Sequence, residues 1–347
     1  MTTDPLASSA TDATKSSSAE STTRPEIAIV VPVFNDWSCV RQLLEALDAI
    51  LRSIDCSVEI VLVDDGSTEP SCTIASWIPT QIDRVVILEL DCNLGHQRAI
   101  AVGLDFCMRQ SPGRAVLVMD GDGEDSPSDV PVLIAAHARS PRSVVVASRS
   151  KRSESIHFRF FYCIYKIVFR LLTGRHVDFG NFCILPAASV RRIVHMHESW
   201  NHLAATLLRS RLQLERLRTA RGRRFAGRSS MNLVGLVTHG FSAVSVFSDV
   251  VLTRLLILAT ATAGVALAAG GTAAALRAFT DLAIPGWATS VVGFSVLLLF
   301  QTLSLLAVMI FVSLSNRSSV PFVPARRAAD YVRQTLFVFD RNARGDR

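Results

Sequence analysis

The sequence has little that would hold together a secreted, disulfide-linked domain. Its seven cysteines are odd in number, and no two of them form a C-x-x-C pair. A scattered set of this kind does not make a disulfide framework, so we expect reduced, mostly buried thiols in a cytosolic domain. The cysteines stand at positions 39, 56, 72, 92, 107, 163 and 183.

An apolar segment is missing from the start of the chain. Residues 1–25 are rich in Ser, Thr, Asp and Ala and contain nothing like the hydrophobic region of a signal peptide. A stretch of this composition cannot bury enough apolar surface to fold by itself. We therefore expect no secretory signal and a disordered tail over residues 1–25.

Charge is absent from two long stretches in the last third of the chain. Residues 255–276 and 287–316 contain no Asp, Glu, Lys or Arg. A helix of about 20 apolar residues crosses a hydrocarbon core, so each stretch can span a membrane, the second with some tilt. Their connection, 277–286, contains Pro285-Gly286 and predicts a tight hairpin loop. Two buried helices of a soluble protein are the alternative.

Arginines flank this hairpin unequally. Seven stand before or after it, whereas the loop contains only Arg277, which Asp281 offsets. The positive-inside rule places both ends of the hairpin in the cytoplasm. We therefore expect a multi-pass protein of the cell inner membrane with a cytoplasmic domain. The flanking arginines are Arg224, Arg228, Arg254, Arg317, Arg326, Arg327 and Arg333.

Short β-branched runs alternate with helical periods from Glu26 onward. Strands that alternate with helices of ten or more residues indicate parallel βαβ units and an α/β sheet. The expected strands are Ile27–Val33, Val58–Val63, Val85–Leu90, Ala115–Met119 and Ser143–Ala147. The expected helices are Cys39–Ser53, Gly95–Arg109 and Ser128–Ser140.

Polar residues follow the first four expected strands. Ligands of such sheets bind beyond the carboxyl ends of the strands, where these loops meet. One loop alone could be an ordinary turn, but four at one edge favour a nucleotide-type site. The loops are Asn35-Asp36, Asp64-Asp65-Gly66-Ser67, Asn93 with Gly95, and Asp120-Gly-Asp122-Gly-Glu124-Asp125.

The acidic loop Asp120–Asp125 is the most informative of the four. Closely spaced carboxylates can hold Mg²⁺ or Mn²⁺ beside a diphosphate, because these ions prefer hard oxygen ligands. A metal shared with phosphates needs only two or three ligands from the protein. A solvated acidic turn is the alternative, since Asp and Gly are common turn residues.

Two further segments are basic. Residues 156–172 place Arg159, Lys166 and Arg170 on one stripe of an apolar helix, which suits a membrane interface; an ordinary core-packing helix is the alternative. Residues 209–228 contain eight arginines against a single acidic residue. Nucleic-acid binding is the usual interpretation of such a run. Its position shortly before the hairpin favours lipid phosphates instead.

These residues together resemble family 2 glycosyltransferases of the A-type, Rossmann-like fold. Within that family the likeness is to polyprenyl-phosphate glycosyltransferases, the dolichol-phosphate mannose synthase and bactoprenol glucosyltransferase type. It covers about residues 26–318 and includes a cytoplasmic domain followed by a transmembrane hairpin. The matching motifs are Pro32-Val-Phe-Asn-Asp36, Val63-Asp-Asp-Gly-Ser67, Met119–Asp125, Asp178-Phe-Gly-Asn-Phe182 and Arg224–Met231.

The resemblance implies a division of the chain and a reaction. It implies a glycosyltransferase domain over 26–245, the hairpin over 246–318 and a cytoplasmic tail over 319–347. The enzyme would transfer a hexose from a UDP- or GDP-sugar to polyprenyl phosphate, with inversion and a divalent metal. The acceptor phosphate is already ionised near neutral pH, so no protein base is needed. Assembly as a homo-oligomer is left open.

The resemblance also assigns roles to residues of this chain. Asp120, Asp122 and Glu124 would hold the metal, Asp64 and Asp65 would meet the base and ribose, and Asp178 would contact the sugar. Arg149 and Arg224 would position phosphate oxygens, to which Arg is well suited. The expected catalytic residues are Asp122, Asp178 and Arg224. The remaining expected substrate-binding residues are Pro32, Phe34, Asp36, Gly95 and Ser229.

The chain departs from the family pattern at three places. Glu124 stands where Gln is common, Ser230 replaces Lys, and Gly95-His96 replaces Gly-Lys. The Gln-x-x-Arg-Trp motif of processive polysaccharide synthases is missing. Two alternatives stay open: transfer to a hydroxyl acceptor, with Glu198 or His202 as the base, and a non-catalytic membrane protein that binds nucleotide sugars.

Overall fold

The computed structural model describes residues 26–71, 74, 76–149, 166–220, 222–226, 233–280, 286–318 and 320–341. An eight-stranded mixed sheet lies at the centre of the domain, in the order β7-β5-β6-β4-β1-β2-β3-β8. The strands are β1 (Glu26–Val33), β2 (Ser57–Asp64), β3 (Arg84–Leu90), β4 (Ala115–Val118), β5 (Val144–Arg149), β6 (Cys183–Leu185), β7 (Leu214–Thr219) and β8 (Val332–Asp340).

The central strands are parallel, as the alternating pattern predicted. β1 pairs with β2 and β4, and β2 pairs with β3, all in parallel. Neighbouring residues of β1 point to opposite faces, and Ile29 and Val30 are both fully buried. A strand that is buried on both faces reads as a continuous apolar run, which explains the sequence of β1.

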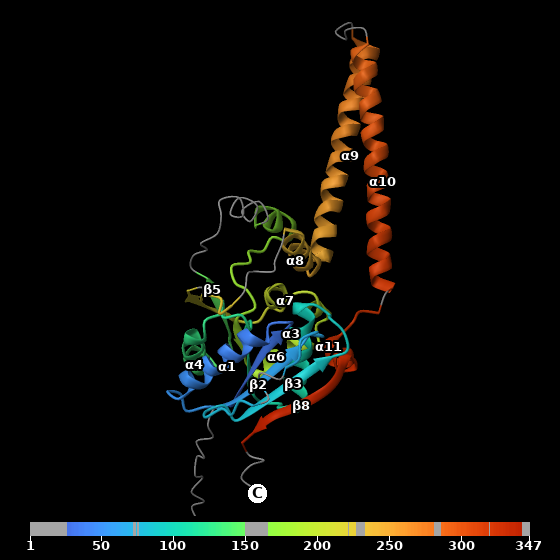
Figure 1. Cartoon of the computed structure of the whole chain (residues 1–347). Coiled ribbons are helices and arrows are strands. Elements are labelled where there is room, and N and C mark those ends of the chain that lie inside the picture. The colour runs from blue at the N-terminus through green and yellow to red at the C-terminus, as the bar shows by residue number, and fades with distance from the viewer. Residues whose placement is uncertain are drawn as a thin grey trace, which may run out of the picture.

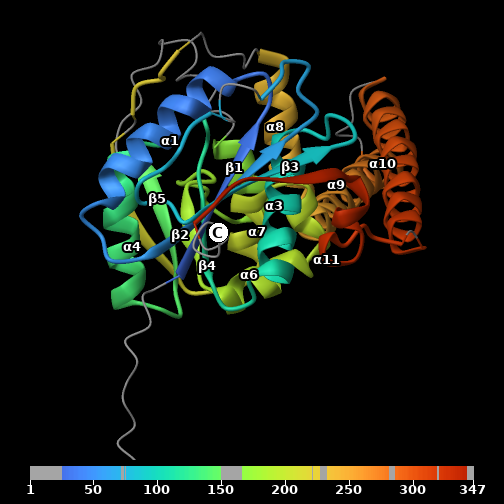
Figure 2. The same ribbon diagram turned by 60° about the horizontal axis from the view of Figure 1, so that its bottom comes forward.

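Helices cover both faces of this sheet (Figure 2). The helices α1 (Trp37–Leu51) and α4 (Val130–Arg139) pack with Ile29 in one apolar cluster. On the other face, α3 (His96–Gln110), α6 (Ala187–Val194) and α7 (Leu203–Arg209) pack with Val30 in a second cluster. Single helical turns at Pro127–Asp129, His197–Trp200, Pro324–Arg327 (α11) and Ala328–Tyr331 complete the domain.

The predicted elements between residues 27 and 147 are all present, with ends within about two residues. Two strands in the half of the sheet beyond β4, namely β6 and β7, were not predicted. β6 is antiparallel to both β4 and β5, and β7 lies parallel to β5 inside the arginine-rich segment. Their sequences are short or strongly charged, so neither shows the apolar pattern of a buried strand.

The last strand comes from the segment that was interpreted as a cytoplasmic tail. β8 pairs antiparallel with β3, with Ile87 opposite Leu336. The Arg84 guanidinium lies 4.7 Å from the ring centroid of Phe337, and Arg333 pairs with Glu89 at 2.7 Å. The segment after the hairpin is therefore part of the sheet and covers the edge of β3.

The two charge-free stretches form a helical hairpin that extends away from the sheet domain (Figure 1). It consists of α9 (Ser248–Phe279) and α10 (Trp287–Ser318), both long and apolar enough to cross a membrane. Their large side chains are mostly exposed, with Phe294 at 73% and Leu267 at 61%. This exposure excludes the alternative of two buried core helices.

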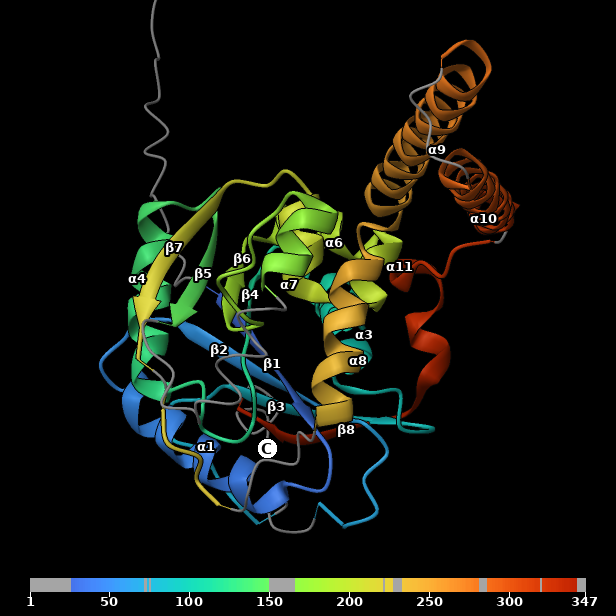
Figure 3. The ribbon, with the colours of Figure 1, turned by 90° about the horizontal axis from the view of Figure 1, so that it is seen from above.

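The base of the hairpin is packed against the domain. α8 (Leu233–Ser245) leads into α9 and lies beside α7, as Figure 3 shows from above. The rings of Phe169 and Phe247 meet edge to face at 6.0 Å. Arg209 Nη1 pairs with Asp249 Oδ1 at 2.7 Å. These contacts tie the first turns of α9 to the same face of the domain as α7.

Candidate active site

The loops after β1 and β2 are joined by hydrogen bonds. The Asn35 side-chain oxygen accepts from the backbone N–H groups of Thr68 at 2.8 Å and Glu69 at 3.3 Å, and the Asn35 N–H donates to Ser67 Oγ at 3.0 Å. Asn35 has a φ of 50°, which Asn adopts more readily than most residues. The Asn35-Asp36 and Asp64–Ser67 motifs therefore form one connected rim.

The two predicted nucleotide-contact carboxylates differ in their surroundings. Asp64 Oδ1 accepts from the Ser67 N–H at 2.9 Å. Asp65 is 3% exposed, and its two oxygens accept from the N–H groups of Leu94 at 2.7 Å and Gly95 at 2.8 Å. Burial raises the pKa of Asp65, although these hydrogen bonds act in the opposite direction. Asp65 thus holds the loop at Gly95, the residue before α3, which has a φ of 93°.

The acidic loop after β4 is held in shape by its own carboxylates. Asp125, which is 2% exposed, accepts from the Asp120 N–H at 3.0 Å. Asp122 Oδ1 accepts from the Glu124 N–H at 2.9 Å. Burial is the main cause that raises the pKa of Asp122, and the neighbouring charges of Asp120 and Glu124 add to it. The loop concentrates negative charge that a cation would relieve.

Arg224 supplies that positive charge from a distant part of the chain. Its Nη2 lies 2.9 Å from Asp36 Oδ2 and its Nη1 lies 3.1 Å from Asp122 Oδ2. The sequence predicted functional roles for all three residues, and the structure brings them together. Their side chains are between 19% and 28% exposed, so a ligand can reach the group.

Residues 222–226, which we name the strap, run along the acidic loop. The N–H groups of Gly222 and Phe225 donate to the carbonyl oxygens of Glu124 and Asp122, both at 2.9 Å. A Cβ atom at Gly123, where φ is 88°, would lie 2.6 Å from the ring of Phe225. The backbone of the acidic loop therefore needs glycine at this position to let the strap approach.

A histidine that the sequence showed only as a departure from a motif also joins the site. His96 Nε2 lies 3.2 Å from Asp120 Oδ1 and 3.0 Å from Asn181 Nδ2. Removal from bulk water lowers the pKa of His96, but Asp120, Asp125 and other carboxylates outweigh that effect and raise it. Its position directly after Gly95 was the signal that could have identified it.

Asp178, the predicted sugar contact, has a partner that the sequence did not indicate. Arg216 Nε from β7 lies 3.1 Å from Asp178 Oδ2. The backbone carbonyl of Asp178 accepts from Ser148 Oγ at 3.2 Å. The pairing depends on the unpredicted β7 strand, so the linear sequence held no signal for it.

Three of the remaining predicted substrate-binding residues lie at or near the same edge of the sheet. Pro32 is within β1, and Phe34 follows that strand with 49% of its surface exposed. Arg149 ends β5 opposite Thr219 of β7. Ser229 and Ser230, together with residues 156–165 of the expected helix 156–172, lie outside the described residues. Residues 166–172 are helical as predicted, and the helix continues to residue 173.

The predicted metal ligands, Asp120, Asp122 and Glu124, do not form a single three-residue cluster in the described part of the chain. No group of three His, Cys, Asp or Glu side chains able to hold a metal occurs in the described part of the chain. Asp122 faces Arg224, and Asp120 faces His96. The carboxylate oxygens of Asp120 and Asp122 are nevertheless of the kind that Mg²⁺ or Mn²⁺ prefers, and such an ion can take its other ligands from a diphosphate. The metal therefore remains a prediction.

The two candidate bases for a hydroxyl acceptor are both engaged elsewhere. Burial, followed by the proximity of His239, lowers the pKa of His202 to about 3. Its Nε2 lies 3.1 Å from His239 Nε2, and its Nδ1 accepts from the Ala205 N–H. Glu198 pairs with Arg209 at 2.7 Å. A histidine with so low a pKa is a weak base at neutral pH.

Comparisons with known proteins agree with this architecture. Residues 28–194 match the family described as Glycosyl transferase family 2. The chain is 28% identical over 184 residues to a dodecaprenyl-phosphate galacturonate synthase of Rhizobium johnstonii, a match that spans 52% of this chain and 53% of that protein. The chain thus spans about half the length of this relative.

Two further proteins are similar over more of their length. An undecaprenyl-phosphate 4-deoxy-4-formamido-L-arabinose transferase of Pectobacterium carotovorum is 26% identical over 274 residues, 74% of this chain and 82% of that protein. The glucosyl-3-phosphoglycerate synthase of Mycobacterium tuberculosis, solved with Mn²⁺, UDP-glucose and phosphoglyceric acid, is similar with a TM-score of 0.48 and 13% identity, over 65% of this chain and 80% of that one. From the family match we conclude that residues 28–194 carry a domain of glycosyltransferase family 2.

Proposed function

We propose that this protein transfers a sugar, in our expectation a hexose, from a nucleotide-diphosphate donor to polyprenyl phosphate at the cytoplasmic face of the inner membrane. One observation carries the proposal. The strap that pairs with Asp122 and Asp36 through Arg224 is followed by α8, which begins at Leu233 and leads into the apolar hairpin. The strap, which contributes Arg224 to the candidate donor site, is therefore followed along the chain by the candidate membrane anchor.

The donor site would be formed by the rim and the acidic loop. Asp64 would contact the base or ribose, while Asp65 positions Gly95 at the start of α3. Asp120 and Asp122 would hold the metal, with Glu124 as a further candidate ligand. When bound, a divalent ion neutralises the charge that develops on the leaving diphosphate. Arg149 and Arg224 would bind phosphate oxygens in the bidentate manner that guanidinium allows.

The reaction would be a single displacement with inversion. An oxygen of the acceptor phosphate forms a bond to the anomeric carbon as the bond from that carbon to the diphosphate breaks, and the nucleoside diphosphate leaves with the electron pair. Asp178, held by Arg216, would orient the sugar. The acceptor oxygen is already ionised near neutral pH, so the low pKa of His202 is no obstacle.

The relatives support a lipid phosphate as acceptor. Two of the proteins to which the chain is similar carry dodecaprenyl phosphate or undecaprenyl phosphate in their names. Both helices of the hairpin are long enough to keep the domain at a membrane surface, where such an acceptor lies. The hydroxyl-acceptor alternative is less well supported, because the pKa of His202 is lowered to about 3 and Glu198 is paired with Arg209 at 2.7 Å.

A transfer assay tests the proposal directly. Purified full-length protein is incubated with radiolabelled UDP- and GDP-sugars, MnCl₂ or MgCl₂, and either undecaprenyl phosphate or diacylglycerol. We expect label in the polyprenyl-phosphate product with at least one donor, and none with diacylglycerol. Transfer to the neutral lipid alone would assign a hydroxyl acceptor, and binding of a nucleotide sugar without any transfer would assign a non-catalytic protein.

A further inference from the structure

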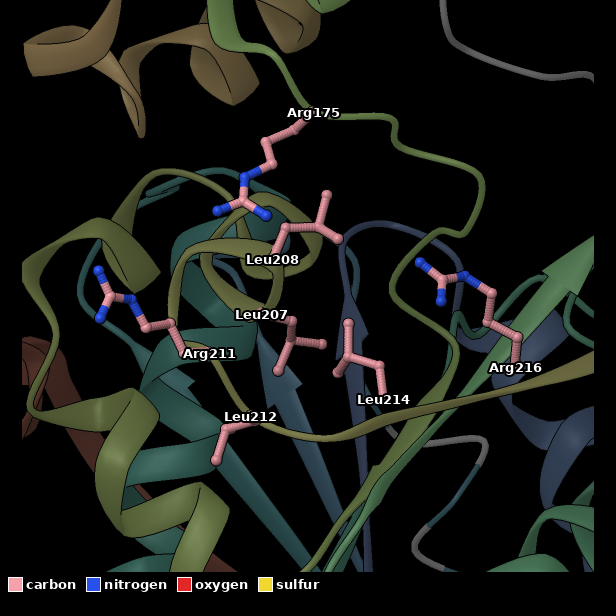
Figure 4. Close-up of a pocket in the computed structure, with 7 residues that line it drawn as sticks. All are labelled: Arg175, Leu207, Leu208, Arg211, Leu212, Leu214 and Arg216. Atoms are coloured by element: carbon pink, nitrogen blue, oxygen red, sulfur yellow. The ribbon is translucent and has the colours of Figure 1, made fainter.

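A second basic site lies outside the rim and the acidic loop. It is an open pocket of about 400 Å³ between α7, the start of β7 and the loop at Arg175. Figure 4 shows three arginine side chains around a group of leucines. The pocket is lined by Arg175, Leu207, Leu208, Arg211, Leu212, Leu214 and Arg216.

The positive charge of this pocket is only partly balanced. Arg216 pairs with Asp178 at 3.1 Å. Among the described residues, no carboxylate lies within ion-pair distance of Arg175 or Arg211, and both residues are exposed. A pocket lined by arginines and leucines binds an amphiphile better than it binds a free anion. Burial of the leucine side chains contributes to the binding free energy only when the ligand carries apolar groups.

The pocket adjoins the part of the domain from which the hairpin leaves. Leu208, one of its lining residues, packs against the cluster that includes Phe169 and Phe247 at the start of α9. The helix over 166–173, just before Arg175, exposes the apolar side chains of Ile167 at 55% and Leu171 at 70%. An apolar surface beside a basic pocket is the arrangement expected where a protein lies in a membrane interface.

We propose that this pocket binds the phosphate headgroup of an anionic glycerophospholipid and so sets the height and tilt of the domain on the membrane. Arg175 and Arg211 contact the phosphate, and Leu208, Leu212 and Leu214 contact the glycerol and the first acyl carbons. The inference rests on the membrane placement given under the proposed function. None of the pocket residues belongs to the loops that carry Asp36, Asp64 or Asp122, although Arg216 pairs with Asp178 of the candidate active site. The phospholipid is proposed as a lipid distinct from the acceptor, and the experiment below separates the two.

Lipid binding to the purified full chain tests this assignment without requiring transfer activity. Native mass spectrometry in detergent measures apparent affinities for phosphatidylglycerol and phosphatidylcholine. We expect preferential binding of phosphatidylglycerol, and a loss of about tenfold or more in that affinity for the double variant Arg175→Gln/Arg211→Gln, because two basic contacts to an anionic headgroup are removed. The charge-keeping variant Arg175→Lys/Arg211→Lys should retain most of the binding.

The matched control is the double variant Arg139→Gln/Arg192→Gln. It replaces two other exposed arginines, which lie in α4 and α6 and outside the pocket. This control should bind phosphatidylglycerol like the parent protein. Equal affinity of the parent for the two lipids, or an unchanged affinity in the Arg175→Gln/Arg211→Gln variant, would overturn the assignment. Displacement of phosphatidylglycerol from the pocket by an equimolar amount of undecaprenyl phosphate would overturn it too, and would make the pocket an acceptor site.

Discussion

Replacement of Arg224 by alanine removes the ion pairs of the strap with Asp36 and Asp122 but leaves its backbone hydrogen bonds to the acidic loop. The guanidinium spans Asp36 at 2.9 Å and Asp122 at 3.1 Å. In the donor complex we expect it to turn to a phosphate oxygen, of either the donor diphosphate or the acceptor. The substitution therefore has two separate consequences, one for transfer and one for metal binding.

The transfer rate should fall. A charge-assisted hydrogen bond contributes about 1.5–3 kcal/mol. If it acts in the transition state, its loss lowers kcat/KM by about ten- to a hundredfold. Arg224→Ala should therefore transfer sugar to polyprenyl phosphate at least about tenfold more slowly than the parent protein.

The variant should bind the metal more tightly, although it transfers sugar more slowly. In the unliganded protein, Arg224 competes with a metal for Asp122. The pair is partly exposed, with side-chain exposures of 24% and 19%, and such pairs are worth about 0.2–1 kcal/mol. The half-saturating Mn²⁺ concentration of Arg224→Ala should therefore be lower by up to about fivefold.

Initial rates of radiolabelled product formation, measured against acceptor and against MnCl₂, give both quantities. The matched control is Arg223→Ala, because Arg223 is the adjacent arginine and is exposed. A drop in rate without a lower Mn²⁺ requirement would contradict the competition for Asp122. An equal loss in the Arg223→Ala variant would show that general positive charge, and not the position of Arg224, is responsible.

The remaining predictions concern metal, topology and pH. Asp122→Ala should remain folded by circular dichroism but lose divalent-dependent transfer; an undiminished rate in excess chelator would refute the metal assignment. A single cysteine at Thr280, in a variant that lacks the native cysteines, should react with an impermeant maleimide from the outer side of intact cells, and labelling only after permeabilisation would reverse the topology. Asp48 is 7% exposed and accepts hydrogen bonds from Thr80 and the Gln81 N–H. Burial raises its pKa, but these bonds outweigh burial and lower the pKa below its ordinary 3.8. A lowered carboxyl pKa stabilises the fold above the unfolded pKa, and this contribution disappears as the pH falls through the folded pKa. Asp48→Asn should therefore destabilise the protein by about 1–3 kcal/mol at pH 7. The difference in unfolding free energy from the parent should shrink in acid below pH 3.8, and a constant difference between pH 7 and pH 3 would contradict the argument.

Much of the domain could be predicted from the sequence because its signals are local. A continuous apolar run such as that of β1 identifies a strand buried on both faces, whatever packs against it. The acidic loop and the uncharged stretches are equally local, since each depends on neighbouring residues alone. The resemblance to a known family, which rests on short local motifs, named Asp36, Asp122 and Arg224 as candidates before their contact was known.

What the sequence could not determine were the pairings between distant segments. β8 lies antiparallel to β3 although more than 240 residues separate Glu89 from its partner Arg333, and no local pattern records that choice. The pairing of Arg216 with Asp178 depends on the position of β7 in the sheet. The sequence determined which residues are charged, apolar or able to turn. Only the tertiary structure decided which charges meet, because the energy of an ion pair depends on a distance in space that the order of residues does not fix.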